Sequence, residues 1–150
     1  MSNQILNIAQ QKKLQISCSY EIMPNGESRT KMKFFDGSEY ILTSRAECAD
    51  GAWQNSHYHK SISETFVVQK GLVASAHFIN KALSLEFYHV GEVFTFRTNE
   101  PHNIYLFGGA IIHTVKQGES RGRDWHASPE LDALTKDLSE QDIFTKIRSH

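Results

Sequence analysis

The sequence predicts an all-β domain, a double-sheet jelly roll closed around a small interior, followed by a short helical C-terminal tail. Short runs rich in aromatic and β-branched residues recur between residues 16 and 116, and turn-forming residues separate them. After Gly118 this pattern stops, and signals for the start of helices replace it. A chain of 150 residues is the size of one domain with a sizeable core.

The predicted barrel occupies residues 16–118, after an N-terminal arm at 1–15 in which residues 4–14 match a short helix. Asp36-Gly37 lies between two of the β runs and is a hairpin signal, because both residue types tolerate a positive φ. The strands are expected at 16–22, 30–36, 39–46, 63–70, 72–79, 84–89, 92–97, 103–107 and 110–116.

Residues 119–150 are predicted to form a loop and a helical tail packed on the barrel. Ser128-Pro129-Glu130 combines a capping residue, a proline for the first turn and an acid near the positive end of the helix dipole. A second capping pattern, Ser139 to Asp142, precedes another apolar run. We therefore expect one or two helices between residues 129 and 148, with Trp125 anchoring the crossing to the barrel.

Composition excludes several classes of function. The formal net charge is −1, with acids and bases interspersed, so there is no electrostatic footprint for nucleic acid or for an anionic membrane. The N-terminus does not resemble a signal peptide, and no apolar run approaches the length of a membrane span. Cys18 and Cys48 form neither a disulfide framework nor a CxxC pair. We expect reduced thiols and a cytoplasmic protein.

A histidine and carboxylate cluster is the main chemical signal. His57 and His59 stand at i and i+2, so on a strand they point to the same side. Glu64 follows at the start of the next β run, and His102 comes after a turn at Gly91. Imidazoles and a carboxylate on converging strands are ligands for a first-row transition metal. A proton-transfer pair of His57 and Glu64 without metal is the alternative.

The spacing of these residues resembles the cupin superfamily. Residues 51–71 match every fixed position of its first motif, G-x5-H-x-H-x4-E-x6-G. The second motif, G-x5-P-x-G-x2-H-x3-N, is matched at Gly91 and His102, but Arg97, Asn99 and Leu106 replace its proline, second glycine and asparagine. The likeness is to small single-domain cupins, and the motifs cover about a third of the chain.

The resemblance implies a double-stranded β-helix, the cupin barrel, with one metal ion held by His57, His59, Glu64 and His102. The candidate ions are divalent Fe, Mn, Ni, Co, Cu and Zn, among which affinity rank alone does not choose. No thiolate belongs to the set, which argues against a closed structural zinc site. Four ligands around an octahedral ion leave two positions for substrate, O2 or water.

The inward faces of the ligand strands also predict a substrate pocket. Asn55 shares a face with the two motif histidines, Phe66 with Glu64 and Leu106 with His102. Leu106 makes this pocket more apolar than the motif asparagine would. His113 is a further candidate, but its run at 110–116 is apolar on both parities, so periodicity does not decide whether it faces inward.

The favoured function is a metal-dependent enzyme on a small polar substrate, a carbohydrate or an oxo-acid. The resemblance implies an isomerase, a decarboxylase or a dioxygenase without choosing among them, and the catalytic residues stay unassigned. A non-catalytic sensor or binding cupin is the first alternative, and a metal-independent nucleotide-sugar epimerase is the second. The expected partners are a small-molecule ligand and, by resemblance to cupins of this size, a second copy in a homodimer.

Overall fold

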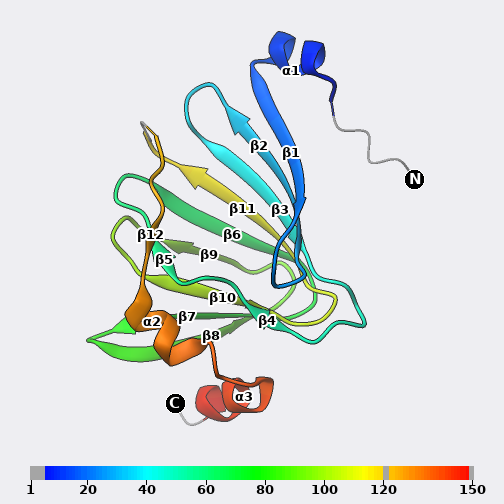
Figure 1. Ribbon diagram of the computed structural model, residues 1–150. Helices are drawn as coiled ribbons and strands as arrows, with labels where there is room; N and C mark the ends of the chain where they lie inside the picture. Colours follow the sequence, from blue (N-terminus) through cyan, green and yellow to red (C-terminus); the bar gives the residue numbers. More distant parts are fainter. Residues whose placement is uncertain (1–5, 120–121, 149–150) are drawn as a thin grey trace.

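Two antiparallel sheets face each other in the computed structural model, which describes residues 6–119 and 122–148 (Figure 1). In spatial order the first sheet contains β1 (Ile16–Ile22), β2 (Ser28–Phe34), β3 (Glu39–Ser44), β11 (Ile111–Gln117), β6 (Ser63–Lys70) and β9 (Val93–Phe96). The second contains β12 (His126–Ala127), β5 (His57–Tyr58), β10 (His102–Leu106), β7 (Val73–Ile79) and β8 (Ala82–Tyr88), with β4 (Ala52–Trp53) paired to β10. The predicted jelly roll with a helical tail is confirmed.

Each of the nine predicted runs contains a strand, and their ends shift by a few residues at most. The predicted hairpin is also present: Gly37 has φ 87°, and the Phe34 N–H donates to the Ser38 carbonyl at 3.0 Å. Three strands were not predicted, namely β4, β5 and β12. Each is two residues long, so no hydrophobic period can mark it, and only pairing with another strand defines it.

Strand register aligns the inward side chains in rows across the first sheet. Lys116 on β11 lies opposite Glu39 on β3 and opposite Glu64 on β6. Because residues directly opposite one another project from the same face, all three side chains enter the space between the sheets. The neighbouring strand β2 continues the pattern, since Lys31 pairs with Ile41, an inward residue of β3.

Apolar side chains fill one end of the space between the sheets. This core contains Phe66, Val68, Val73, Phe94, Phe96, Ile104, Leu106, Ala110 and Ile112. The polar residues Glu64 and His102 stand beside it, at the ends of the same strands. The other end of the sandwich is therefore left for a polar site.

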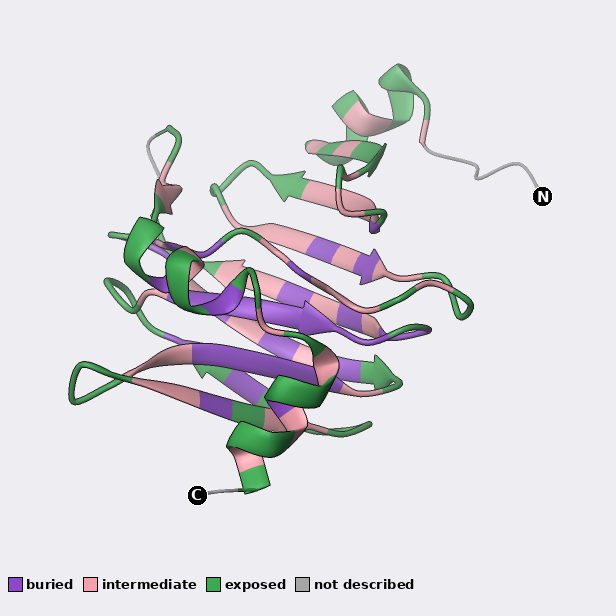
Figure 2. Ribbon diagram, turned by 60° about the horizontal axis from the view of Figure 1, so that its bottom comes forward, coloured by how far each residue is buried: buried purple, intermediate pink, exposed green. Residues whose placement is uncertain are grey.

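The helical tail covers the outer face of the second sheet. Helices α2 (Pro129–Thr135) and α3 (Glu140–Arg148) bury Leu131 and Ile143 in a second core with Trp53, Ala74, Ala76, Leu85, Tyr105 and Phe107. Strand β10 is thus packed on both faces, and all five of its residues are buried (Figure 2). The predicted capping pattern at α3 is present, with the Asp142 N–H donating to Ser139 Oγ at 3.2 Å.

The N-terminal helix α1 (Ile8–Leu14) buries none of its residues, and Ile8 is 77% exposed. A capping box closes its first turn, in which Asn7 and Gln10 exchange side-chain to main-chain hydrogen bonds. The predicted start of this helix at residue 4, and residues 120–121 and 149–150 of the predicted tail, lie outside the described residues. Within the described ranges, no helix is long and apolar enough to cross a membrane.

Candidate metal centre and its cavity

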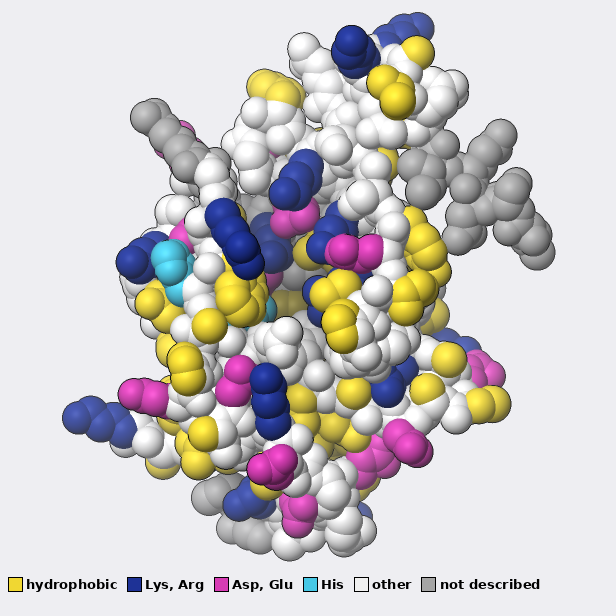
Figure 3. Space-filling view, viewed as in Figure 1, with side chains coloured by type: hydrophobic (Ala, Val, Ile, Leu, Met, Phe, Trp, Pro, Cys, Tyr) yellow, Lys and Arg dark blue, Asp and Glu magenta, His cyan; other side chains and the backbone are white. Residues whose placement is uncertain are grey.

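The polar end of the sandwich holds a cavity of about 430 Å3. Its walls are the inner faces of β2, β3, β6 and β11, the segment 53–57 and the loop 23–25. Arg123 and Trp125, from the segment that precedes β12, complete the lining. The space-filling view shows the hollow with Lys and Arg side chains gathered around it (Figure 3).

Three imidazoles surround one carboxylate at this site. Glu64 Oε2 lies 2.6 Å from His102 Nε2 and 3.3 Å from His57 Nε2. The other oxygen, Oε1, lies 3.3 Å from His59 Nε2. One ligand atom from each of His57, Glu64 and His102 falls within 4.8 Å of the others, close enough to hold a metal ion together. The structure thus gathers all four residues that the sequence pointed to.

The opposite ring nitrogen of each histidine is hydrogen-bonded to a main-chain carbonyl. His57 Nδ1 contacts Asn55 O at 2.9 Å, His102 Nδ1 contacts Glu100 O at 2.9 Å, and His59 Nδ1 contacts Asp124 O. A carbonyl can only accept, so Nδ1 carries the hydrogen in all three rings. In the neutral rings the lone pairs of Nε2 therefore converge on the Glu64 carboxylate.

Lys116 donates to Glu64 Oε1, but among the described residues no donor is left for the three Nε2 atoms and Glu64 Oε2 unless a further cation is present. His59 Nε2 is buried and has no hydrogen-bond partner, although Glu64 Oε1 is near it. Burial lowers the pKa of His57, which favours the neutral ring. Burial opposes the ionisation of Glu64, but in the metal-free site hydrogen bonds from the histidines, where a proton on Nε2 takes the place of the ion, and the charge of Lys116 hold the Glu64 pKa well below its usual range. Neutral imidazoles around a carboxylate fit a divalent transition metal.

Asp124 fixes one of the ligands. Besides its carbonyl contact with His59, its carboxylate accepts hydrogen bonds from the main-chain N–H groups of Lys60 at 2.9 Å and Ser61 at 2.8 Å. The Ser61 hydroxyl donates to the same carboxylate at 2.8 Å. Asp124 thus ties the segment before β12 to the turn after the His-x-His motif. Groups that orient metal-binding histidines in this way tune metal affinity.

Two aromatic rings fix the other two histidines. The ring of Phe96 is stacked on His102, with 4.3 Å between centroids and 4° between planes. The ring of Trp125 is stacked on His57 at 5.5 Å and 22°. Trp125 therefore does join the tail segment to the barrel, and it does so at the site itself. The two rings also keep water away from one side of each imidazole.

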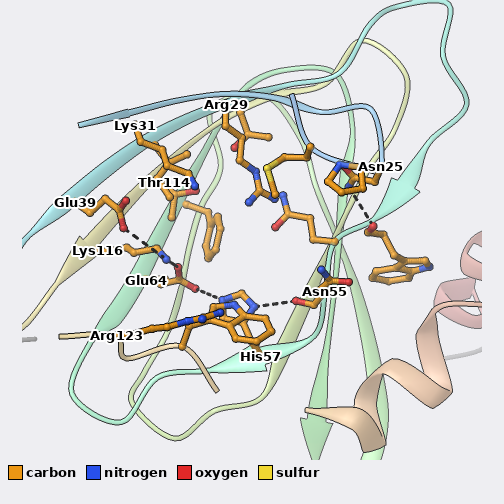
Figure 4. Close-up of a pocket in the computed structure, with 18 residues that line it drawn as sticks. Asn25, Arg29, Lys31, Glu39, Asn55, His57, Glu64, Thr114, Lys116 and Arg123 are labelled. Carbon is orange, nitrogen blue, oxygen red and sulfur yellow. Dashed lines mark hydrogen bonds and ion pairs between the residues drawn. The ribbon is translucent and has the colours of Figure 1, made fainter. Parts of the chain in front are cut away.

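Lys116 is a cation in direct contact with the cluster. Its Nζ lies 2.9 Å from Glu64 Oε1 and 3.9 Å from Glu39 Oε2 (Figure 4). The Lys116 side chain is mostly buried, and it lines the cavity together with both carboxylates. It leaves Glu64 Oε2, the oxygen that faces His57 and His102, for a metal ion.

The candidate pocket residues separate into two groups. Asn55 and Phe66 line the cavity. Leu106 does not: it is fully buried in the apolar core beyond the cavity. His113 does not line it either, because its parity on β11 is opposite to that of Thr114 and Lys116, which do. The predictions for Leu106 and His113 are corrected accordingly.

His113 instead contacts two residues on the outer face of the first sheet. Its Nδ1 lies 2.6 Å from Tyr40 Oη, and its Nε2 lies 2.5 Å from Gln69 Oε1. Its strand is apolar on both faces, so alternation carried no information about which face turns inward. The pairing of β11 with β3 and β6 decides it.

The sequence pattern did not point to five charged residues that line the cavity, namely Arg29, Lys31, Glu39, Lys116 and Arg123. One signal was available for two of them. Basic residues alternate with other residue types over the β2 segment at positions 29, 31 and 33, which places all three on one face of the strand. That this face turns inward follows only from pairing with β3.

Comparison with solved structures identifies the barrel. No protein-family model and no curated protein sequence matches the chain. The oxalate decarboxylase of Bacillus subtilis, studied for its Mn(II) centres, is similar in structure with a TM-score of 0.60 and 14% identity. The match covers 87% of this chain and 37% of that one, so the chain spans less than half of the decarboxylase.

KdgF from Halomonas sp. is similar with a TM-score of 0.56 and 12% identity, over 69% of this chain and 87% of that one. Both proteins are cupins, and the chain has the cupin fold. The expected fold is therefore confirmed. The structure separately brings His57, Glu64 and His102 close enough together that they could hold a metal ion.

Proposed function

We propose that this protein is a metal-dependent enzyme that acts on a small polar substrate, a carbohydrate or an oxo-acid. His57, His59, Glu64 and His102 would hold one divalent transition metal ion. When bound, the ion would supply a Lewis acid that polarises an oxygen of the substrate. The likeness to an oxalate decarboxylase with Mn(II) centres makes manganese one of the first ions to test.

The single observation that carries this proposal is the set of three Nδ1 contacts to main-chain carbonyls. They leave three Nε2 lone pairs around a buried carboxylate, and Lys116 contacts only its Oε1, so the side of Oε2, His57 and His102 needs a further cation to be stable. A metal-independent epimerase has no need of this arrangement. We therefore place that alternative behind the metalloenzyme.

Side chains of the cavity would orient the substrate and exclude water from it. Phe66 gives the cavity an apolar wall, while Asn55 gives it a polar one. Trp125 is stacked on His57 and Arg123 lies over the Trp125 ring, so the two side chains restrict access of water to that side. Small-molecule sites are built in this way, with an apolar lining and a few convergent polar groups. Isomerisation, decarboxylation and dioxygenation are each compatible with this lining.

The first experiment is elemental analysis of protein purified without a histidine tag or chelator. We expect nearly one equivalent of a transition metal, either as isolated or after addition of Mn2+, Fe2+ or Zn2+. His59→Ala should lose most of it, because a buried ligand is removed from a set of four. His113→Ala is the matched control and should keep it, because His113 lies on the outer face of the sheet.

Circular dichroism should show that both variants are folded, since the fold depends on its core and not on the ion. Wild-type protein that takes up no metal after reconstitution would refute the metalloenzyme. Equal metal content in wild type and His59→Ala would refute the ligand assignment. Stoichiometric metal without turnover of oxalate, other oxo-acids or uronates would favour a non-catalytic binding protein.

A further inference from the structure

We propose that Arg29, assisted by Lys31, forms an anion-binding subsite in the cavity wall across from the His-Glu cluster. The subsite would take the carboxylate or phosphate group of a small dianionic substrate whose other end reaches the metal. The inference rests on the proposed function, which it deepens by naming the charge type of the substrate and the residue that recognises it. Figure 4 shows Arg29 and Lys31 entering the cavity from the β2 side, while His57 and Glu64 lie on the opposite side.

The charge of the cavity favours an anion. Four basic side chains line it, against the two carboxylates of Glu39 and Glu64, while the carboxylates of Glu27 and Glu21 pair with Arg29 and Lys31 from outside the lining. The chain as a whole has a formal charge of −1, so this concentration of basic residues is local. A bound divalent ion would add further positive charge. In a concave site with low-dielectric walls, such an excess raises the local concentration of anions.

Two of the four basic groups are engaged by other residues that line the cavity. Lys116 lies between Glu64 and Glu39. Arg123 lies over the ring of Trp125, with 5.8 Å from its Cζ to the ring centroid, and its side chain is exposed. Arg29 and Lys31 remain, on neighbouring inward positions of one strand. Lys31 is also paired with Glu21 near the surface, which leaves Arg29 as the principal group.

Arg29 is held in place from behind by a buried carboxylate. Its Nη2 donates to Glu27 Oε2 at 2.9 Å, and Glu27 is 0% exposed. Gln54 Nε2 donates to the same oxygen at 3.1 Å. An arginine that is already oriented loses less conformational entropy when an anion binds than a mobile surface arginine does. The pair with Glu27 thus prepares the guanidinium for a ligand.

The same pair leaves hydrogen-bond donors of Arg29 unused. An arginine that served only to neutralise a carboxylate would be expected to bind it in the bidentate manner, through two N–H groups and two oxygens. Here Glu27 makes one contact with Arg29, and both Glu27 Oε1 and the buried Arg29 Nε are without a hydrogen-bond partner. The guanidinium, which lines the cavity, therefore retains N–H groups for an oxyanion.

Binding of defined dianions tests the subsite directly. Malonate, succinate and glutarate carry a carboxylate at each end, and acetate is the monoanionic comparison. Phosphoglycolate replaces one carboxylate with a phosphate, which carries about −1.5 to −2 charges at pH 7 and so also adds charge. Titration calorimetry would give each Kd on metal-loaded and on metal-free protein. Trp53 and Trp125, the two tryptophans of the chain, both line the cavity, so their fluorescence offers a second readout.

We expect Arg29→Gln to weaken the best dianion by about 10- to 100-fold, the effect of losing a charge-assisted hydrogen bond. Arg29→Lys should weaken it less, because the charge remains while the planar fork is lost. Lys33→Gln is the matched control. Lys33 lies on the same face of β2, but it is exposed and does not line the cavity, so its loss should leave the Kd unchanged.

Arg29→Gln leaves Glu27 buried without its cation, so a double variant, Glu27→Gln with Arg29→Gln, guards against misfolding. It should be folded and should bind dianions as weakly as the single variant. Dianion affinity equal to wild type in either variant would overturn the proposal. So would an equal loss of affinity in Lys33→Gln, which would indicate a general effect of charge.

Metal content measured on each variant separates the two proposals. Arg29→Gln should keep the metal of the wild type while it loses dianion affinity, which supports the subsite and the metal centre together. If the wild-type chain bound no metal but Arg29→Gln still lost dianion affinity, the proposed function would fail and the anion subsite would stand. A preference for phosphoglycolate over succinate would identify the anion as a phosphate, and the reverse as a carboxylate.

Discussion

At the scale of single residues, the metal centre depends on groups that orient the histidines as much as on the histidines themselves. Main-chain carbonyls of Asn55, Glu100 and Asp124 each fix one imidazole. Two of these carbonyls lie two residues before the histidine that they hold. The third comes from a segment 65 residues further along the chain than His59. The geometry of His59 therefore depends on how the tail segment is attached.

Asp124→Ala is predicted to weaken metal binding without removing a ligand. The substitution keeps the carbonyl that faces His59 but removes the carboxylate that ties it to the main chain of Lys60 and Ser61. We expect a loss of about 10- to 100-fold in metal affinity, the usual effect of changing a group that orients a ligand. Competition with a chromophoric chelator would measure it.

Ser61→Ala provides the graded control for Asp124. It removes the hydrogen bond from the Ser61 hydroxyl but keeps the two from main-chain N–H groups and the contact with His126 Nε2, so its effect should be smaller. An Asp124→Ala protein with wild-type metal affinity would show that the tail segment holds its position without this carboxylate.

At the scale of elements, the tail helices complete the barrel from outside. They supply the apolar partners for the outer face of β10, β7 and β8. Helix α2 also contacts the site strand directly, since Asp132 Oδ1 accepts a hydrogen bond from the Ser56 N–H at 2.8 Å. Ser56 immediately precedes β5, which carries His57. The tail is thus packed against the strand that begins the metal-binding motif.

Leu131→Ala is predicted to destabilise the fold by about 2–5 kcal/mol, because Leu131 is completely buried between α2 and the sheet and its loss leaves a cavity. Leu134→Ala, in the same helix, removes the same atoms from a side chain that is 46% exposed and should cost no more than about 0.5 kcal/mol. Urea denaturation of the two variants would measure both values. Similar free energies of unfolding for the pair would contradict the packing of the tail on the sheet.

The whole molecule should be stabilised by the metal. An ion that binds only the folded chain at a hundred times its Kd adds about 2.7 kcal/mol to the free energy of unfolding. We therefore expect Mn2+ or another bound ion to raise the melting temperature of the chelator-treated protein. His57→Ala should abolish most of that increase, since it removes one of the three residues whose ligand atoms lie closest together. An increase that survives in this variant would place the ion elsewhere.

The metal-free protein should lose stability as the pH falls. Burial opposes the ionisation of Asp124, but hydrogen bonds from Lys60 and Ser61 hold its pKa well below the usual range. The pKa of Glu64 is also depressed, by the surrounding histidines and Lys116. A carboxyl whose pKa is depressed in the folded state makes its full contribution to the free energy of unfolding when the pH is above the pKa of the group in the unfolded chain, about 4. That contribution is lost as the pH falls from there toward the depressed pKa of the folded state.

Burial lowers the pKa of His57 in the folded protein. As the pH falls below about 6.5, the unfolded chain therefore binds a proton at this residue more readily than the folded chain does, and the free energy of unfolding decreases further. The urea midpoint should therefore decrease between about pH 7 and pH 3. Asp124→Asn should reduce that decrease, because one of the titrating groups is gone. A midpoint that is level over this range would contradict the ionised carboxylates of the folded state.

The expected homodimer stays a prediction.

The sequence by itself determined the fold class and the four candidate ligands. Turn residues between short β runs specify strands locally, and a strand places His57 and His59 on one side whatever its partners are. The spacing to Glu64 and His102 then carried the likeness to cupins. None of these inferences required knowledge of which strands pair.

Only the tertiary structure decided which side of each remaining strand faces the site. The run that contains His113 and Lys116 is apolar on both faces, and pairing with β3 and β6 turned Lys116 inward and His113 outward. Asp124 reaches His59 across 65 residues, and Arg29 reaches the cavity because β2 pairs with β3. Register and long-range contact are cooperative properties of the folded sheet, so they cannot be read from a local pattern.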